Sequence, residues 1–390
     1  MFLNIKINNQ TIDKQPVEIV ERKGLGHPDT ICDLVVDQLS IRISQIYLKE
    51  FGTICHFNFD KAFLAAGTAE NRFGGGKIVK PMLFVIGDRA TEKFGQKKID
   101  LEKIIRQETY RFLKEKYRFL NEKNFIIQNE IKPASSSLAG IFARGGDILP
   151  ANDTSALVGY APMTKLEEIV FKLEQFLNSK SFKKEYPETG EDIKIMGYRE
   201  NKKTHLVLAI AFVDRFVKSE SDYFYKKNLA EKAIEKFLKK NFHEKISFEI
   251  NALDEKGQGV AGCYLTVTGT SADSGDSGEV GRGNRVNGVI PLNRVAGSEA
   301  SAGKNCVSHV GKIYNLLSFK IADEIFRTTG KKNTVWLVSK IGQPVNQPAL
   351  ISILIENLTK KDKEKAEEIV KKNFFRIDKF IEDLIWGKWR

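Results

Sequence analysis

The sequence of 390 residues has little cysteine, and its four cysteines, Cys32, Cys55, Cys263 and Cys306, form no C-x-x-C pair. This argues against both a zinc ribbon and a disulfide scaffold. The chain also lacks a run of about 18 apolar residues that could cross a membrane. Residues 1–15 mix Asn, Lys and Asp with short apolar pairs, so they lack the apolar core of a secretion signal. We therefore expect a cytoplasmic protein with no membrane partner.

Positive charge is in excess, since 62 Lys and Arg residues face 50 Asp and Glu residues, for a net charge of +12. Such an excess suits a polyanion, either nucleic acid or a nucleotide. The lysines are spread along helical faces such as residues 360–372, and no aromatic-rich RNA motif or recognition-helix pattern accompanies them. Nucleic acid is therefore not the expected partner. A noncatalytic nucleotide or nucleic-acid binder stays a competing interpretation, which predicts salt-sensitive binding.

The length of the chain exceeds what one hydrophobic core usually covers, which predicts two or three domains. Approximate boundaries are residues 1–150, 151–260 and 261–390, with domains interleaved in sequence. Apolar residues recur at steps of three and four in six predicted helices, at residues 28–47, 101–120, 166–177, 223–242, 307–327 and 366–385. Thr164 and Glu167 form a capping box before the third of these helices.

Predicted strands are rich in β-branched and aromatic residues, and they lie at residues 54–65, 82–86, 205–213, 246–250, 263–268, 334–341 and 349–355. Strand pairs alternate with long helices, in a rhythm that recurs about three times. This pattern favours an α/β (α+β) fold in which helices cover one face of a mixed sheet. Loops are predicted at breaks rich in glycine or polar residues, at 71–76, 143–150, 187–190 and 273–283.

The segment 266–315 contains nine glycines, and charged residues are threaded among them: Asp273, Asp276, Arg282, Arg285, Arg294, Lys304, His309 and Lys312. Glycine lets the backbone approach a ligand closely, and the interleaved charges suit a polyphosphate with its metal ions. Arg282 and Arg285 flank a flexible backbone, which matches bidentate phosphate recognition. The segment is not a P-loop, because Ser298 and Asn305 stand where that motif needs glycine and Ser or Thr.

A second candidate region is the motif GLGHPD at residues 24–29. Proline favours the first helical turn, so His27 and Asp29 lie at the amino end of a predicted helix, where unpaired N–H groups favour anions. His27 can act as a donor or acid near a phosphate ester, and Asp29 can bind a divalent cation carried by a nucleotide. The alternatives are a helix-capping histidine and an ordinary acidic residue of the first turn.

Two further polar motifs favour structural interpretations. Asp60 and Lys61 are adjacent opposite charges, typical of a surface ion pair. Residues 152–155 (NDTS) are typical of a cap or turn made by Asx and hydroxyl groups.

Taken in order, seven segments resemble the archaeal-type branch of the S-adenosylmethionine synthetase family. They are residues 21–29 (ERKGLGHPD), 73–76 (FGGG), 151–155 (ANDTS), 190–194 (GEDIK), 265–271 (LTVTGTS), 281–288 (GRGNRVNG) and 308–315 (SHVGKIYN). Each segment alone is weak evidence for the family. Together the seven ordered matches span nearly the whole chain and are very specific for it.

The resemblance implies an enzyme that joins L-methionine to ATP by sulfur attack at the ribose C5′. The triphosphate is expelled and then cut to phosphate and diphosphate. The resemblance also implies three similarly built domains of mixed β-sheet and helices around a pseudo-threefold axis, a homodimer with shared active sites, Mg²⁺ and often K⁺. Carried onto this chain, His27, Lys304 and Arg282 would be catalytic and Asp29 would bind the metal. Substrate contacts would come from Glu21, Lys61, Asp153, Asp276, Arg285, His309 and Lys312.

Three places depart from the family pattern: residues 131–137 (IKPASSS), the pair Val295-Ala296, and Cys306. They motivate a second hypothesis, a divergent paralogue that uses ATP with a different nucleophile or hydrolyses the triphosphate.

Overall fold

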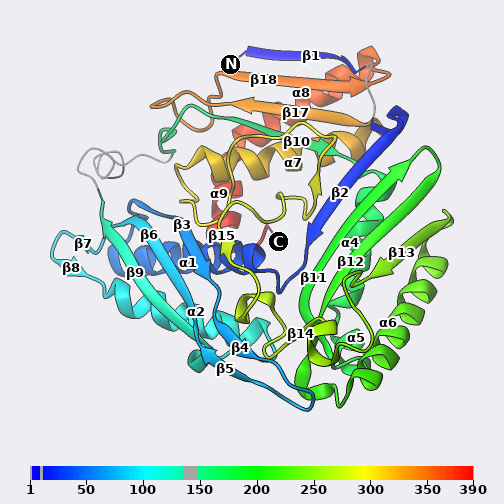
Figure 1. The fold of residues 1–390 in the computed structure, drawn as a ribbon. Coiled ribbons are helices and arrows are strands. Elements are labelled where there is room, and N and C mark those ends of the chain that lie inside the picture. Colours follow the sequence, from blue (N-terminus) through cyan, green and yellow to red (C-terminus); the bar gives the residue numbers. More distant parts are fainter. Residues whose placement is uncertain (1, 9–11, 135–141, 143–147, 390) are drawn as a thin grey trace.

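The computed structural model describes residues 2–8, 12–134, 142 and 148–389. Three mixed β-sheets form its framework, and helices α1, α7 and α9 lie among them (Figure 1). Sheet A has the order β1 (Phe2–Asn8), β18 (Leu350–Glu356), β17 (Asn333–Val338) and β10 (Ala156–Ala161). Sheet C has the order β15 (Gly278–Glu279), β3 (Phe57–Ala65), β6 (Met82–Ala90) and β9 (Phe125–Pro133).

Sheet B has the order β13 (Ile246–Ile250), β12 (Lys203–Val213), β11 (Thr189–Glu200), β2 (Val17–Lys23) and β16 (Ile290–Pro291), with β14 (Leu265–Thr266) paired to β12. Two small pairs stand apart, β4–β5 (Thr68–Glu70 and Lys77–Lys80) and β7–β8 (Lys93–Phe94 and Lys97–Lys98). Short 3-10 helices are Ile12–Lys14, Glu122–Asn124, Asp214–Phe216, Gly259–Gly262 and Ser271–Asp273.

The three sheets repeat one pattern of pairing. In each, an antiparallel pair is joined at its edge by a parallel strand: β1 beside β18 in sheet A, β13 beside β12 in sheet B, and β9 beside β6 in sheet C; in sheet B the two-residue strand β14 also pairs with β12 in parallel. A long helix precedes the central antiparallel pair every time: α1 (Pro28–Phe51), α4 (Lys165–Leu177) or α7 (Val310–Thr329). A second helix follows the pair: α2 (Leu101–Lys116), α6 (Glu220–Asn241) or α8 (Lys360–Phe375). The expected rhythm of a helix with a strand pair is therefore confirmed three times.

The strand that precedes each of these long helices joins the sheet of another unit. The strand β2 comes before α1 but lies in sheet B, and β10 comes before α4 but lies in sheet A. Two short strands come before α7, β15 in sheet C and then β16 in sheet B. Residues 1–150 thus supply strands to all three sheets. The linear domain boundaries at 150 and 260 remain a prediction.

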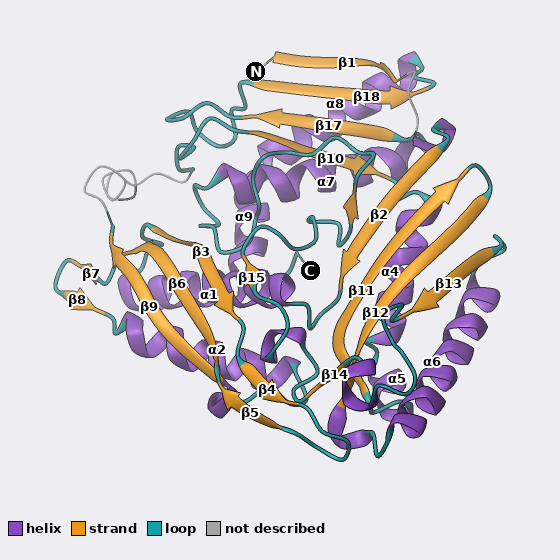
Figure 2. Ribbon diagram, viewed as in Figure 1, coloured by secondary structure: helices purple, strands orange, loops and turns teal. Residues whose placement is uncertain are grey.

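Two hydrophobic cores fill the molecule. One runs from sheet C through α1 and α7 to sheet A, with Tyr47, Phe57 and Tyr314 among its most buried side chains. The other belongs to sheet B and the helices α4, α5 (Lys180–Glu185) and α6, which lie along one side of that sheet (Figure 2).

Several sequence-based element predictions need correction. The helix expected over 366–385 is two helices, α8 and α9 (Ile377–Ile385), which meet at Arg376. The strand expected at 263–268 is only the two residues of β14. The loop expected at 187–190 overlaps the start of β11, and residues 143–147 of another predicted loop lie outside the described residues. The strand β2 was missed because Ile19 and Val20 are adjacent and residues 21–23 are all charged, which breaks the alternation expected of a strand. The capping box of Thr164 and Glu167 on α4 is confirmed.

Candidate functional site

The helix α1 begins at the GLGHPD motif. His27 is its N-cap, and the ring Nδ1 accepts a hydrogen bond from the backbone N–H of Asp29 at 3.2 Å. A side chain at Gly26 is excluded by close packing on β11, since a Cβ there would lie 2.4 Å from the backbone nitrogen of Asp192. Burial lowers the pKa of His27 to about 4, so the ring is neutral near pH 7. Because Nδ1 accepts, the neutral ring carries its proton on Nε2.

Charged groups surround His27 in what we call the α1 cluster: Glu21, Lys23, His27, Asp29, Lys194, Asp276 and the backbone of Arg282. The Lys23 ammonium lies 2.8 Å from the Asp29 carboxylate and donates to the carbonyl of Arg282 at 2.6 Å. The other Asp29 oxygen accepts the N–H of Glu279 at 2.8 Å. Lys23 and Asp29 therefore join the two remote motifs, the amino end of α1 and the glycine-rich loop.

The remaining members of the α1 cluster come from β2, β11 and the glycine-rich loop. Lys194 lies 3.2 Å from Glu21 across neighbouring strands. Asp276 and Lys194 are close enough to shift the pKa of His27 in opposite directions. Asp276 and the side chain of Arg282 are exposed to solvent. Sequence reasoning missed Lys23 and Lys194 as site residues, although both stand inside motifs of the family pattern.

The helix α7 begins in the same way as α1. His309 is its N-cap, and Nδ1 accepts the N–H of Gly311 at 3.2 Å. Burial, reinforced by the nearby Lys304, lowers the pKa of His309 to about 3. This ring is also neutral near pH 7, with its proton on Nε2.

The surroundings of His309 form the α7 cluster: Asp60, Lys61, Glu299, Lys304 and His309. The Lys304 ammonium is buried and pairs with Asp60 at 2.8 Å and with Glu299 at 3.2 Å. Burial alone would raise the pKa of Asp60, but Lys304 and Lys61 lower it to about 2. The interpretation of Asp60 and Lys61 as only a surface ion pair is therefore wrong, because Asp60 is also the counter-ion of a buried lysine.

Asp153 lies in the loop 152–155, beside the start of α7. The neighbouring Asn152 receives the backbone N–H of Val310 at 3.1 Å and donates its own N–H to the carbonyl of Ser308. The predicted capping role of this motif is confirmed, and the helix that it caps is a distant one. The Asp153 side chain itself is exposed, and within the described residues it accepts the N–H of Thr154.

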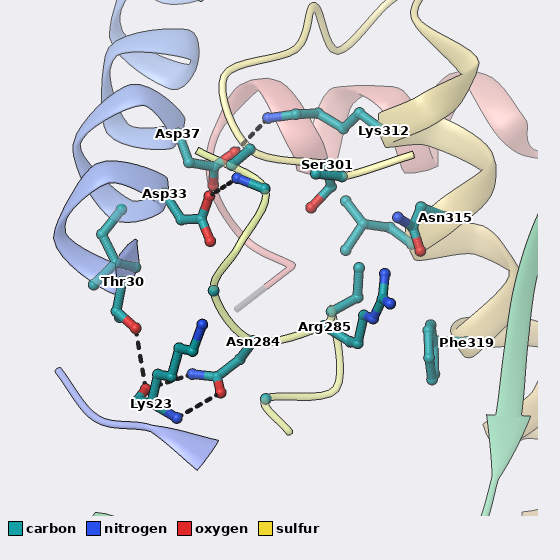
Figure 3. Close-up of a pocket in the computed structure, with 18 of the residues that line it drawn as sticks. Lys23, Thr30, Asp33, Asp37, Asn284, Arg285, Ser301, Lys312, Asn315 and Phe319 are labelled. Atoms are coloured by element: carbon teal, nitrogen blue, oxygen red, sulfur yellow. Dashed lines mark hydrogen bonds and ion pairs between the residues drawn. The ribbon is translucent and has the colours of Figure 1, made fainter. Parts of the chain in front are cut away.

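Two predicted substrate contacts, Arg285 and Lys312, are not members of either cluster, although Lys312 is close enough to lower the pKa of His309. They line a central cavity of about 730 Å³ between α1, α4 and α7, which Figure 3 shows in close-up. Lys312 pairs with Asp37 of α1 at 2.6 Å. Arg285 points into the cavity beside Phe319 (Figure 3).

The two clusters are electrostatically separate within the part of the chain that the structure describes. The strongest charged influences on the His27 pKa are Asp29, Lys23, Asp276 and Lys194, whereas those on the His309 pKa are Lys304, Asp60, Lys312 and Lys61. The structure thus brings His27 to the Arg282 loop, and Lys304 to His309 and Lys61, and among the described residues the strongest charged influences on the two rings are not shared.

A metal ion held by protein ligands alone is not supported in the described part of the chain, where no three His, Cys, Asp or Glu side chains are arranged to hold one. Likewise, none of the described helices combines the length and apolar character that crossing a membrane requires.

Two helix N-termini, each with a neutral histidine and nearby lysines, define the class of site: they suit phosphorylated ligands, because free N–H groups and cations there favour anions. The comparisons with known proteins agree. The sequence matches the S-adenosylmethionine synthetase (AdoMet synthetase) family over residues 3–388, and the chain belongs to this family.

Similar curated proteins cover nearly the same length. An S-adenosylmethionine synthase of Pyrobaculum aerophilum is 44% identical over 395 residues, covering 98% of each chain. That of Pyrococcus furiosus is 41% identical over 348 residues, covering 88% of this chain and 86% of the relative. Among solved structures, an unusual S-adenosylmethionine synthetase from Campylobacter jejuni superposes with a TM-score of 0.65 at 17% identity, covering 95% of this chain and 90% of that one. This likeness confirms the fold.

Proposed function

We propose that this chain makes S-adenosylmethionine from ATP and L-methionine, by sulfur attack at the ribose C5′ with release of phosphate and diphosphate. The observation that carries the proposal is the pair of histidine-capped helix ends, each beside lysines, in a chain of this family. The divergent-paralogue hypothesis has less support. Of its altered segments, residues 135–137 lie outside the described residues, and Cys306 is buried against Ser44 in the core.

The chemistry needs alignment and charge stabilisation more than it needs a strong base. A thioether is a neutral nucleophile, so the barrier falls when sulfur, C5′ and the leaving oxygen are held in line. Negative charge then builds on the triphosphate. The Nε2–H groups of His27 and His309 are donors fixed by their caps, and Lys304 is a buried cation. Preorganised groups of this kind are worth about 2.7–4 kcal/mol each when they face developing charge.

Mg²⁺ fits beside Asp29. This carboxylate is buried and faces the same space as His27, and Mg²⁺ usually takes one or two carboxylates together with substrate phosphates. Bound there with the nucleotide, Mg²⁺ would supply charge neutralisation for the triphosphate. Asp29 now pairs with Lys23, so we propose that Lys23 turns toward the phosphates when the metal binds. We assign no residue to K⁺.

We further propose a homodimer in which the α1 cluster of one subunit meets the α7 cluster of its partner. The separation of the two clusters within one chain supports this arrangement. The outer face of sheet C supports it too, because Phe63, Leu83, Val85 and Ile126 lie together there in register, and Phe63 and Ile126 are 45% and 49% exposed. Apolar faces of this kind mark association surfaces.

Complementation between inactive subunits tests the shared site. Differently tagged His27→Asn and Lys304→Met subunits are coexpressed, and the heterodimer is purified through both tags. If the site is shared, one of its two sites carries no substitution, so about half of the wild-type activity returns. An inactive heterodimer would show that each subunit holds both clusters in its own site.

Product analysis tests the reaction. The folded protein is incubated with ATP, L-methionine and Mg²⁺, and the products are identified by mass spectrometry. We expect S-adenosylmethionine, phosphate and diphosphate in equal amounts, and no ATP consumption when methionine is omitted. ATP consumption without methionine, and without formation of S-adenosylmethionine, would favour the divergent paralogue instead.

A further inference from the structure

The central cavity lies between the long helices of the three units and touches each cluster at one residue, Lys23 of the α1 cluster and Glu299 of the α7 cluster. One long helix of each unit contributes to its wall: α1 with Asp33 and Asp37, α4 with Phe171 and Glu174, and α7 with Asn315 and Phe319. Residues of the loop 281–288 and Trp389, near the end of the chain, also line the cavity. The volume of about 730 Å³ falls in the range of small-molecule sites. The cavity is large enough for a ligand of its own.

The cations in the wall are not all neutralised. Arg22, Lys23 and Lys312 each form an ion pair with a carboxylate, at 2.6–2.8 Å. Arg285 has neither an ion pair nor a side-chain hydrogen bond to any part of the chain that the structure describes. Figure 3 shows its guanidinium directed into the cavity beside Phe319 and Asn315.

The carboxylates in the wall have partners already. Asp37, Glu174 and Glu299 are each paired with a lysine or arginine. Asp33 accepts the backbone N–H of Gly281 at 2.8 Å, and burial raises its pKa to about 7. Asp33 is therefore about half protonated near pH 7, and Arg285 is the one cation without a paired carboxylate in the described wall, which suits a ligand with a single negative charge.

The wall around Arg285 is aromatic. Tyr160 and Phe319 form an edge-to-face pair with ring centroids 5.0 Å apart, and Arg294 covers one face of Tyr160 at 4.0 Å. Phe171 lines the opposite wall, with Arg22 stacked over it at 4.7 Å. Rings arranged in this way favour a planar apolar group, which packs against aromatic side chains.

We propose that this cavity is a second ligand site, for a small organic monoanion whose planar body packs on Phe319 and Tyr160 while Arg285 binds its acidic group. The occupant differs in kind from the nucleotide triphosphate assigned to the two clusters, because three of the four wall cations are already paired and cannot hold several phosphates. The site stands independently of the proposed reaction.

Fluorescence titration with 8-anilinonaphthalene-1-sulfonate, a planar aromatic monoanion, tests the site. We expect wild-type protein to bind one probe molecule per chain in this cavity, and we expect two variants to impair that binding. Arg285→Gln should weaken this binding about tenfold, the effect of losing one ion pair of about 1.4 kcal/mol. Gln175→Trp, a change at an exposed residue of the cavity rim on α4, should block entry.

Controls separate this site from other surfaces. Arg106→Gln removes an exposed arginine of α2, outside the cavity, and should leave probe binding unchanged. The neutral analogue N-phenyl-1-naphthylamine should bind equally to the wild type and to Arg285→Gln. Saturating ATP with Mg²⁺ should not displace the probe. Unaltered probe binding in Arg285→Gln, or displacement by ATP, would overturn the proposal, and neither outcome depends on whether S-adenosylmethionine is formed.

Discussion

The amino ends of α1 and α7 have the same local structure and different surroundings. In both, a histidine caps the helix through Nδ1 at 3.2 Å, and burial keeps the ring neutral. Around His27 the strongest charged neighbour is the carboxylate of Asp29, and the nearest lysine is paired with it. Around His309 the dominant neighbour is the cation of Lys304. The same histidine cap therefore lies in two different electrostatic environments.

The third equivalent helix completes the comparison. The helix α4 begins at Thr164 with a capping box and has no histidine there. The Thr164 hydroxyl is buried and donates a hydrogen bond to the Glu18 carboxylate, so protein groups occupy this helix end. Fold repetition thus supplies three similar helix ends, and side-chain identity makes only two of them suitable for phosphates.

The largest effect should come from replacing the two histidines. His27→Asn and His309→Asn should each lower turnover by a factor of about 10²–10³, since each removes a donor that faces developing charge. The free energy of unfolding should change by less than about 1 kcal/mol, because asparagine is also a good N-cap. Turnover and chemical denaturation are measured on the same preparations.

Thr164→Asn makes the same replacement at the third helix end and should leave turnover unchanged. A loss of turnover in that variant equal to the loss in the histidine variants would mean that capping, and not the ring proton, accounts for the effect.

A smaller effect, on the Mg²⁺ dependence of activity, should distinguish the carboxylates of Asp29 and Asp60. Asp29→Asn should raise the Mg²⁺ concentration needed for half-maximal activity about tenfold, because a carboxylate ligand becomes a neutral one. Asp60→Asn should lower turnover by weakening the position of Lys304 and should leave the Mg²⁺ midpoint in place. Equal midpoint shifts in an activity titration of both variants would remove the assignment of the metal to Asp29.

The last effect concerns the stability of the fold as a function of pH, not activity, and it has opposite signs for Asp192 and His27. Burial raises the pKa of Asp192 to about 7, above the usual 3.9 or so for an unfolded chain. The folded state therefore binds more protons, and the stability from Asp192 falls as pH rises from about 4 to 7, by at most about 1.4 kcal/mol per pH unit. Burial lowers the pKa of His27 to about 4, so the folded state binds fewer protons than the unfolded state, and the stability from His27 rises between about pH 4 and 6.5.

Denaturation curves at several pH values test this pair of slopes. Asp192→Asn should make the stability rise more steeply with pH between about 4 and 7, and His27→Asn should make it rise less. Slopes that change in the same direction in the two variants would contradict either the raised pKa of Asp192 or the lowered pKa of His27.

Much of the local structure could be predicted from the sequence. The run of apolar residues after Pro28 predicted α1, and Pro28 placed His27 and Asp29 at its amino end, where both lie. Periodicity identified helices well because their burial depends on spacing along one segment. It failed for β2 and β11, where adjacent charged residues such as Glu21 to Lys23 and Glu191-Asp192 break the alternation expected of a strand. Hydrogen-bond partners 170 residues apart leave no local signal.

The sequence by itself determined the family, the long helices and the place of His27 at the amino end of α1, because these depend on residue order within short segments. The predicted helix over residues 307–327 placed His309 inside the helix, whereas α7 begins at Val310 with His309 as its N-cap. Only the tertiary structure decided that the Arg282 loop meets α1 through Lys23, that Lys304 and His309 form a separate cluster, and that Arg285 faces a central cavity. The physical reason is that the strand before each long helix joins another sheet, so a residue's neighbours are set by packing among three units and not by distance along the chain.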